Sequence, residues 1–384
     1  MELRNSIFIH TYRTFLNGKG ANIYIENAQI YNCSMELKFF FLVDNCNFEI
    51  NGFLISNCSF KNGGLFEGSK THFIGIRINI FETSFSSFEN SIIKSDFTFF
   101  LFDFSIKNCT LQNMSIFKVY QRNNSEELYF FLFNSSFINI YQVSTEIKIP
   151  LILDYKAFNG ESFFFNLNFE DLFTYNYILS ITNSLKKIYI FNLLFSYCYS
   201  YDGIFIHSTN ETYLWNICFK NQNNAPEIKG DWFKLGSCIF LLSLNRMFLK
   251  NITITEAISN RTTSGLKLIN NFTPLQNNNE HLLENLNFVR NKVFYFGNMN
   301  ISCSVLIQGH FFLKIISSFF KGNELDGLLK TNYKIGGPCI HFYSEKGSLN
   351  IETSKFYSNA AKFYSNYIEF HGNTLTITTS FFQN

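Results

Sequence analysis

The sequence predicts an all-β chain of about 13 repeated units, each a coil of short strands stacked on the next. Three observations favour this fold. A spaced apolar pattern recurs every 24 to 36 residues, a spacing typical of solenoids, propellers and other repeat arrays. Each repeat alternates at period two and is rich in Phe, Ile, Leu, Tyr and Thr, as strands are. No apolar stripe follows the periodicity of a helix.

Each repeat ends on an anchor residue, which is apolar in all cases. The anchors are Met35, Phe60, Phe85, Leu111, Phe137, Phe169, Phe195, Phe219, Ile254, Phe288, Phe320, Phe356 and Phe382. A second large apolar residue stands five positions before each anchor. The first intervals are 25 residues, which suits three short strands with tight turns. Longer intervals predict loops inserted near 141–162, 221–237 and 259–280, within one domain covering 1–384.

Asn recurs three positions before the anchor and marks a predicted bend. These residues are Asn32, Asn57, Asn108, Asn134, Asn166, Asn192, Asn216, Asn251 and Asn285. Inward positions change parity at this point, so the strand must bend there, and Asn tolerates the left-handed backbone conformation. Stacked coils would align the amides in a hydrogen-bonded ladder. Other residues interrupt this ladder, so its last third should be less regular: Glu82, Ser317, Thr353 and Thr379.

A second corner is predicted where Asn45-Cys46-Asn47-Phe48 copies the motif half a coil out of phase.

The chain stops at Asn384, in the middle of a repeat. We therefore expect this sequence to be a piece of a longer protein.

Composition excludes some classes of partner. Charged residues make up 16% of the chain, against about 25% in typical soluble domains, and the net charge is +2. Without a run of basic residues, nucleic-acid binding has no electrostatic footprint. The most apolar stretches, Phe97–Ile106 and Leu128–Ile140, are shorter than the roughly 20 apolar residues that a membrane-spanning helix needs.

The nine cysteines include no CxxC pair, so the sequence predicts no zinc site and no thioredoxin-like redox site. Cys33, Cys58 and Cys109 share one phase of the repeat and are interpreted as small buried fillers. Cys33 and Cys58 would lie on neighbouring coils, and a disulfide between them stays open at this point.

Two further motifs carry a resemblance to a known family. Gly336-Gly337-Pro338-Cys339-Ile340 precedes the strand pattern Leu349–Phe356, and Gly63-Gly64-Leu65-Phe66 echoes its glycine pair. A Phe-x-x-Asn element occurs at Phe288…Asn291, Phe320…Asn323 and Phe356…Asn359. The chain thus resembles the right-handed parallel β-helix of the pectin-lyase-like superfamily. More narrowly, it is similar to the polymorphic-outer-membrane-type repeats of protist surface proteins, although Pro338 replaces the Ala of that motif.

No catalytic, cofactor-binding or metal-binding residues are predicted. Glycosidases need two carboxylates within about 5–10 Å, and no two acidic residues fall at one phase of neighbouring repeats. Glu67 and Asp202 share a phase but lie several repeats apart. Seven scattered His residues give no Ser–His–Asp set and no metal spacing. We therefore expect a protein that is not an enzyme and uses no cofactor.

Sequons suggest a secreted chain. Of eleven Asn-x-Ser/Thr sites, those in the inserted loops are the candidate glycosylation sites, namely Asn123, Asn210, Asn260 and Asn271. The leading hypothesis is a structural or adhesive part of a large extracellular or cell-surface glycoprotein whose partner is a protein or a carbohydrate. The alternative is a carbohydrate-binding or polysaccharide-cleaving protein that uses exposed aromatic residues such as Trp215 and Trp232.

Overall fold

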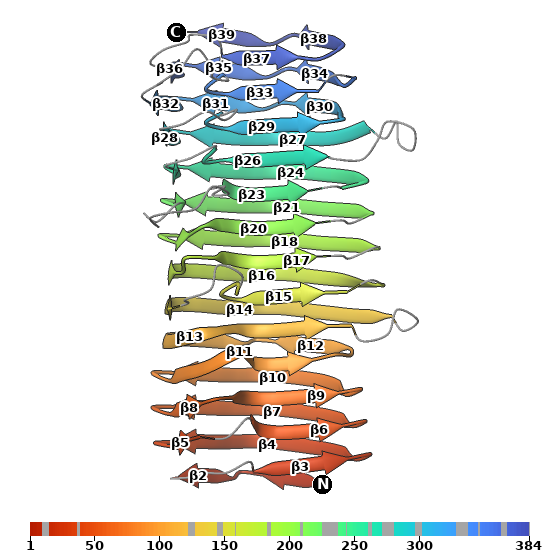
Figure 1. Cartoon of the computed structure of the whole chain (residues 1–384), viewed down its shortest axis with the longest axis vertical. Coiled ribbons are helices and arrows are strands. Elements are labelled where there is room, and N and C mark those ends of the chain that lie inside the picture. Colours follow the sequence, from red (N-terminus) through yellow and green to blue (C-terminus); the bar gives the residue numbers. More distant parts are fainter. Residues whose placement is uncertain are drawn as a thin grey trace. The chain divides into compact units, whose positions relative to one another are not determined.

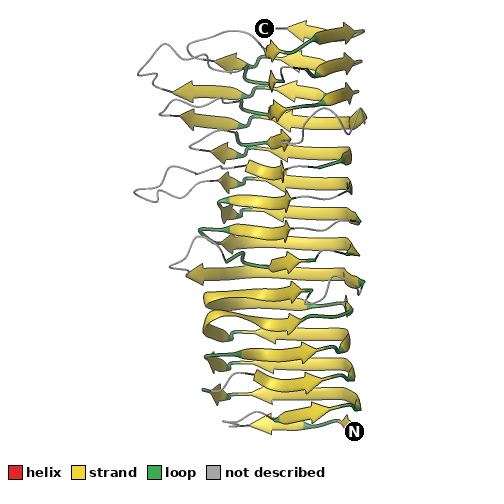
Figure 2. Ribbon diagram, turned by 45° about the vertical axis from the view of Figure 1, so that its right-hand side comes forward, coloured by secondary structure: helices red, strands yellow, loops and turns green. Residues whose placement is uncertain are grey.

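In the computed structural model, the residues described are 1–9, 15–36, 39–121, 127–143, 149–157, 159–182, 186–207, 210–224, 237–242, 244–259, 263–270, 280–295, 302–327, 337–344, 346–361 and 367–383. Strands are their only regular element, so the predicted all-β class is confirmed (Figure 2). They form two compact units, Met1–Tyr189 and Ile190–Asn384. The prediction of a single domain stays a prediction.

The strands of the first unit are 2 to 16 residues long, and many successive strands are separated by only two residues. They are β1 (Glu2–Arg4), β2 (Ile7–Ile9), β3 (Leu16–Lys19), β4 (Asn22–Tyr31), β5 (Ser34–Met35), β6 (Phe39–Asp44), β7 (Asn47–Ser56), β8 (Ser59–Lys61), β9 (Gly64–Ser69), β10 (His72–Phe81), β11 (Ser84–Ser95), β12 (Phe99–Phe102), β13 (Ser105–Tyr120), β14 (Leu128–Val143), β15 (Leu153–Lys156), β16 (Gly160–Phe173) and β17 (Tyr177–Thr182). β18 (Lys187–Ser196) contains the boundary between the units.

The second unit repeats this organisation. Its strands are β19 (Tyr199–Ser200), β20 (Asp202–His207), β21 (Glu211–Lys220), β22 (Asn223–Asn224), β23 (Ser237–Leu242), β24 (Arg246–Thr255), β25 (Ile258–Ser259), β26 (Leu266–Asn270), β27 (Glu280–Val289), β28 (Lys292–Tyr295), β29 (Val305–Gly309), β30 (Phe312–Ile316), β31 (Phe319–Lys321), β32 (Glu324–Gly327), β33 (Ile340–Tyr343), β34 (Ser348–Glu352), β35 (Lys355–Tyr357), β36 (Ala360–Ala361), β37 (Ile368–His371), β38 (Thr374–Thr378) and β39 (Phe381–Gln383).

Strand pairing in each unit is parallel and joins residues one repeat apart. In the first unit, β7 lies between β4 and β10, and Ile30, Ile55 and Ile80 are successive partners (Figure 1). In the second unit, β24 lies between β21 and β27 in the same way. Because the pairing is in register, equivalent side chains of successive repeats line up in columns.

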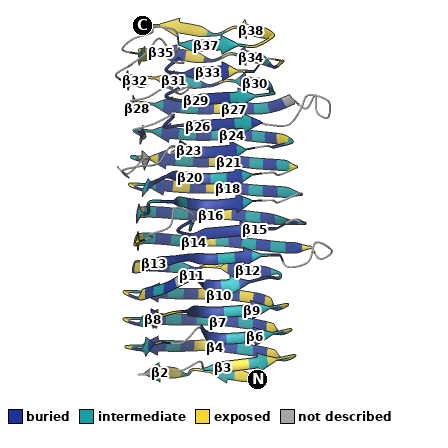
Figure 3. Ribbon diagram, viewed as in Figure 1, coloured by how far each residue is buried: buried dark blue, intermediate teal, exposed yellow. Residues whose placement is uncertain are grey.

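The core consists of the inward columns. The residues five before the first anchors form one of them, with Ile30, Ile55, Ile80 and Ile106 all 0% exposed. Buried and partly exposed positions alternate along β14 and β16, as the period-two pattern predicts (Figure 3). Close approach of neighbouring coils also restricts side-chain size: a Cβ on Gly64 would lie 2.2 Å from the Ser91 carbonyl oxygen.

The predicted repeat boundary at Phe137 is wrong. Leu111 pairs with Gln142, whereas Phe137 pairs with Ile106, and the repeat here is 31 residues long rather than 26. Phe137 therefore belongs to the column of Ile80 and Ile106, which stand five positions before their anchors, and not to the column of the anchors themselves. The physical reason is that each coil has two similar corners five residues apart, so the same apolar and Asn pattern fits either corner.

Two of the predicted loop insertions contain strands. Range 141–162 includes β15 and the ends of β14 and β16, and range 259–280 includes β26. β15 pairs with β13 and β17, and β26 pairs with β23 and β29, so each occupies an equivalent place in successive coils. The repeat pattern does not predict β15 and β26, because it is built on the anchor residues and these strands contain none of them. In range 221–237, the described part includes β22, and positions 225–236 lie outside the described residues.

Candidate functional site

The nine predicted Asn residues all occupy corners with a left-handed backbone. Their φ angles lie between 49° and 57°, a conformation that Asn accepts more readily than most side chains. All are exposed except Asn251, which is half-buried. Asn45, at the predicted second corner, has a φ of 53°. The amides therefore line the outer surface of each unit along its corners.

The nine residues do not form the single ladder that the sequence predicts. Asn57 Nδ2 donates to Asn32 Oδ1 (2.7 Å), but Asn108 accepts from Asn139 (2.9 Å) and not from Asn134. The Nδ2 of Asn166 in turn donates to Asn134 (3.1 Å), at the corner five residues earlier in the coil. The first unit thus has two amide columns, because Asn occurs at both corners.

In the second unit the amide column is continuous. Asn216 donates to Asn192 (2.9 Å), Asn251 to Asn216 (2.8 Å) and Asn285 to Asn251 (2.7 Å). Beyond it, the hydroxyls of Ser317 and Thr353 lie 3.2 Å apart at corners of the same left-handed conformation. Hydroxyl groups thus replace the amides at the corners where the sequence predicts an interruption of the ladder.

The second unit also contains a buried Asn ladder, which the sequence analysis does not predict. Asn291, Asn323 and Asn359 lie inside the second unit, each directly after a corner residue. The Nδ2 of Asn291 donates to Asn323 Oδ1 (3.0 Å), and that of Asn323 donates to Asn359 Oδ1 (2.8 Å). The sequence signal for this ladder is the Phe-x-x-Asn element, which recurs at Asn291, Asn323 and Asn359.

The backbone N–H of the residue after a corner is hydrogen-bonded in a recurring way. A bend turns its backbone N–H away from the strand ladder, and a polar side chain of the next coil accepts that hydrogen bond. Examples are Phe104 N to Ser135 Oγ (3.3 Å) and Leu286 N to Ser318 Oγ (3.2 Å). This explains why small polar residues occur at an inward position, since an unpaired buried N–H is costly.

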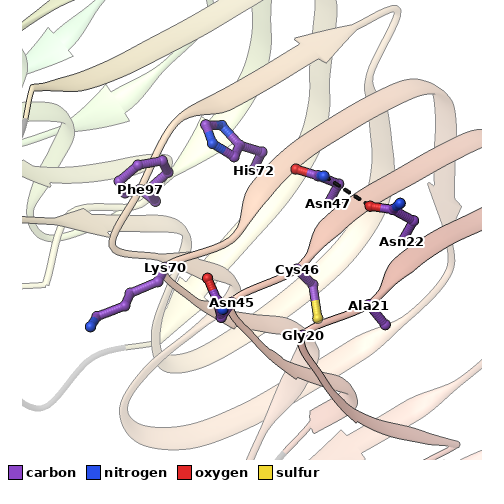
Figure 4. Close-up of a pocket in the computed structure, with 9 residues that line it drawn as sticks. All are labelled: Gly20, Ala21, Asn22, Asn45, Cys46, Asn47, Lys70, His72 and Phe97. Atoms are coloured by element: carbon purple, nitrogen blue, oxygen red, sulfur yellow. Dashed lines mark hydrogen bonds between the residues drawn. The ribbon is translucent and has the colours of Figure 1, made fainter.

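A polar corner pocket of about 410 Å³ lies in the first unit. Its lining residues are Gly20, Ala21, Asn22, Asn45, Cys46, Asn47, Lys70, His72 and Phe97. Asn47 Nδ2 donates to Asn22 Oδ1 (2.9 Å), and the His72 and Phe97 rings meet edge to face 4.6 Å apart. In Figure 4 the Lys70 side chain points away from the other side chains. The pocket therefore presents amides and an imidazole next to an aromatic ring.

A neighbouring groove of about 730 Å³ shares Asn22, Asn47 and His72 with this pocket. It adds polar and apolar groups, including Glu49 and Phe100. Residues Tyr24, Glu49, Ile74 and Phe100 are successive register partners on β4, β7, β10 and β12. The groove therefore runs across the outer face of these strands.

Phe100 lines the groove and is also the first member of an aromatic face. We give this name to the outward side chains of Phe100, Phe131, Phe163 and Tyr189 in one row and Phe102, Phe133 and Phe165 in the next. In the first row, ring centroids are 4.4, 4.9 and 4.7 Å apart and the planes lie within 11° of parallel. This spacing matches the distance of about 4.8 Å between paired strands.

The aromatic face is partly exposed. Phe102 and Phe165 are each 36% exposed, whereas their inward neighbours Leu101 and Phe164 are 0% exposed. The sequence signal was the loss of alternation in Phe99–Phe102 and around Phe131. These stretches are apolar on both faces of the strand, and their length alone shows only that they are too short for a membrane-spanning helix. Contiguous apolar surface of this kind marks interaction sites on many proteins.

The candidate glycosylation sites and the Trp residues singled out in the sequence belong to the second unit or lie outside the described residues. Asn210 is exposed just before β21, and Asn123, Asn260 and Asn271 lie outside the described residues, as does Trp232. Trp215 is 44% exposed on the second unit, and Lys250 Nζ lies 5.5 Å from the centroid of one of its rings. None of the nine cysteines forms a disulfide in this structure, and eight are buried.

Titratable groups are scattered in the part of the chain that the structure describes. Among those residues no three His, Cys, Asp or Glu side chains converge on a metal site. Nor does any helix there have the length and apolar character needed to cross a membrane. The described carboxylates of Glu67 and Asp202 belong to different units, and Glu67 pairs with Lys94 at 2.6 Å.

Two buried histidines should make the second unit sensitive to acid. Burial lowers the pKa of His281 and that of His341 to about 4, with Arg246 adding to the effect at His281. Folding therefore favours neutral imidazole, and this stability is present above pH ~6.5 and is lost as the pH falls toward 4. We expect the thermal midpoint to fall over this range, and less steeply in His281→Leu and His341→Leu. Equal slopes in wild type and variants would contradict this prediction.

Comparison with protein-family models and with curated proteins finds no match to this chain.

Proposed function

We propose that the chain is a right-handed parallel β-helix solenoid of the kind suggested by its resemblance to the pectin-lyase-like superfamily and to polymorphic-outer-membrane-type repeats. Parallel pairing one repeat apart within each unit supports this proposal. So do the left-handed corners that recur in every coil. Such a body is rigid and repetitive, and its strands project long columns of equivalent side chains outward.

The function that the geometry supports best is non-enzymatic adhesion, as part of an extracellular or cell-surface protein. The aromatic face carries this proposal. Its two rows hold seven aromatic rings and no charged side chain. Stacked rings lose little conformational entropy on binding, and they provide a rigid apolar surface for a partner.

An adhesion assay tests the proposal. Beads coated with the chain are allowed to settle on cell layers, and adherent beads are counted after washing. Replacing Phe131 and Phe163 together with Thr, which keeps strand propensity, should reduce adhesion about tenfold or more. The matched control is Tyr213→Thr with Phe248→Thr, which removes an outward stacked pair of the second unit (5.0 Å). Equal adhesion by wild type and both variants would refute the proposal.

Carbohydrate binding is a second candidate function. The groove favours it, because Asn22, Asn47 and His72 lie beside apolar Ile74 and Phe100. Amides and an imidazole suit sugar hydroxyls, while an apolar wall suits the C–H face of a sugar ring. Polysaccharide cleavage would need an acid and a base in addition.

A panel of acidic and neutral polysaccharides separates these candidates. Carbohydrate binding predicts retention on at least one polymer, lost in Asn47→Ala with His72→Ala. A polysaccharide-cleaving enzyme would in addition release new reducing ends, and that result would overturn the non-enzymatic proposal. Adhesion that depends on Phe131 without retention on any polymer would favour a protein partner.

A further inference from the structure

One inward column of the first unit brings two cysteines together. Cys33, Cys58, Thr83 and Cys109 each follow a left-handed corner residue, and all four are buried. Their neighbours pair in register, Ser34 with Ser59 and Ser59 with Ser84. Cys33 and Cys58 are therefore directly stacked on adjacent coils, whereas Thr83 separates Cys58 from Cys109.

The contacts place the Cys58 sulfur beside the Cys33 backbone. The Cys33 backbone N–H donates to Cys58 Sγ at 3.5 Å, and the two thiols lie within hydrogen-bonding reach of each other. Paired strands lie about 4.8 Å apart, which falls within the ~4.4–6.8 Å separation of Cα atoms that disulfides span. The register therefore places the two residues at a Cα separation that a disulfide can span.

We propose that Cys33 and Cys58 form a disulfide that cross-links two neighbouring coils when the chain folds in an oxidising environment. The oxidant is a small-molecule disulfide such as glutathione disulfide. One cysteine thiolate attacks it, forms a mixed disulfide and releases one glutathione thiolate. The second cysteine then attacks the protein sulfur of this mixed disulfide and expels the second glutathione. Two protein thiols are thus oxidised, one disulfide is reduced to two thiols, and the thiol protons pass to the released glutathione.

The timing follows from burial. Desolvation raises the pKa of the Cys58 thiol to about 11, so thiolate is scarce once the coil is folded. The bond should therefore form while the chain folds, before the corner closes, and should resist reduction afterwards. The other cysteines of this unit have hydroxyl neighbours instead: Cys46 N–H donates to Thr71 Oγ1 (3.3 Å), and Cys109 stacks on Thr83.

The test is to refold the full chain from denaturant with reduced and oxidised glutathione, alkylate the remaining thiols and map the peptides. We expect one peptide pair that joins Cys33 to Cys58 and has lost two hydrogen atoms. The thermal midpoint should rise by about 5 °C or more relative to chain refolded under reducing conditions, because the bond closes a loop of about 25 residues in the unfolded state.

Variants with the residue of the neighbouring coil provide the controls. Cys58→Thr is conservative, because Thr83 Oγ1 donates to the Phe81 carbonyl (2.7 Å) as Cys58 Sγ donates to that of Ser56 (3.2 Å). Cys33→Thr and Cys58→Thr should each abolish the cross-link and the rise in midpoint, and Cys109→Thr should retain both. The inference is overturned if Cys33 and Cys58 are still alkylated after oxidative refolding, or if the cross-link joins other cysteines. The wild-type peptide map decides this even if a variant fails to fold.

Discussion

Phe320→Ala should lower the free energy of unfolding by about 3–5 kcal/mol, because it removes a ring from the middle of a buried column. Phe320 is 0% exposed. Its ring stacks between Phe288 (5.4 Å) and Phe356 (4.7 Å), with both pairs within 7° of parallel. The substitution forfeits the transfer of the ring from water and leaves a cavity that rigid strands on either side cannot fill.

Phe382→Ala is the matched control for this prediction. Phe382 belongs to the same column and stacks on Phe356 at 4.6 Å, but it is 40% exposed. Its loss should cost about 1 kcal/mol, since much of the ring already contacts water. Urea unfolding followed by circular dichroism measures both variants. Equal destabilisation by the two substitutions would mean that column position does not determine the contribution of a ring.

The sequence predicts strand content and the inward columns well, because period-two alternation reports directly on burial. Ile30, Ile55 and Ile80 are identified as core partners from spacing alone, and their pairing agrees. The left-handed corners are equally local, since Asn has a side chain suited to that backbone conformation.

The column to which a corner belongs could not be predicted. Asn108 and Asn134 have the same local sequence pattern, yet they occupy different corners, because pairing depends on contacts a full coil away. The two corners of a coil are five residues apart, and each has the same pattern of Asn and apolar residues around it. The pattern therefore cannot show which of the two corners a given Asn occupies. The aromatic face was missed for a related reason: outward Phe residues are visible only when the strand face is known.

Asn323→Leu should destabilise the chain by about 3 kcal/mol or more, because Leu has the branched shape of Asn but can make none of its hydrogen bonds. The Asn323 side chain makes four hydrogen bonds inside the second unit. Its Nδ2 donates to the Phe288 carbonyl (3.0 Å) and to Asn359 Oδ1 (2.8 Å), and its Oδ1 accepts from the backbone N–H and the Nδ2 of Asn291. Leu would leave these buried partners without a bond and without access to water, and each such group costs about 1–3 kcal/mol.

Asn285→Gly provides the comparison, because Asn285 belongs to the exposed ladder and Gly accepts its left-handed backbone (φ 54°). Its Nδ2 donates only to Asn251 among the described residues (2.7 Å), and the half-buried Asn251 amide that loses this partner can bond to water instead. Its cost should be about 1 kcal/mol or less. A urea midpoint for Asn323→Leu no lower than that for Asn285→Gly would show that the buried ladder does not stabilise the stacked coils. The expected difference would instead assign the stabilising role to the inward Asn column and leave the outward amides available for contact with a partner.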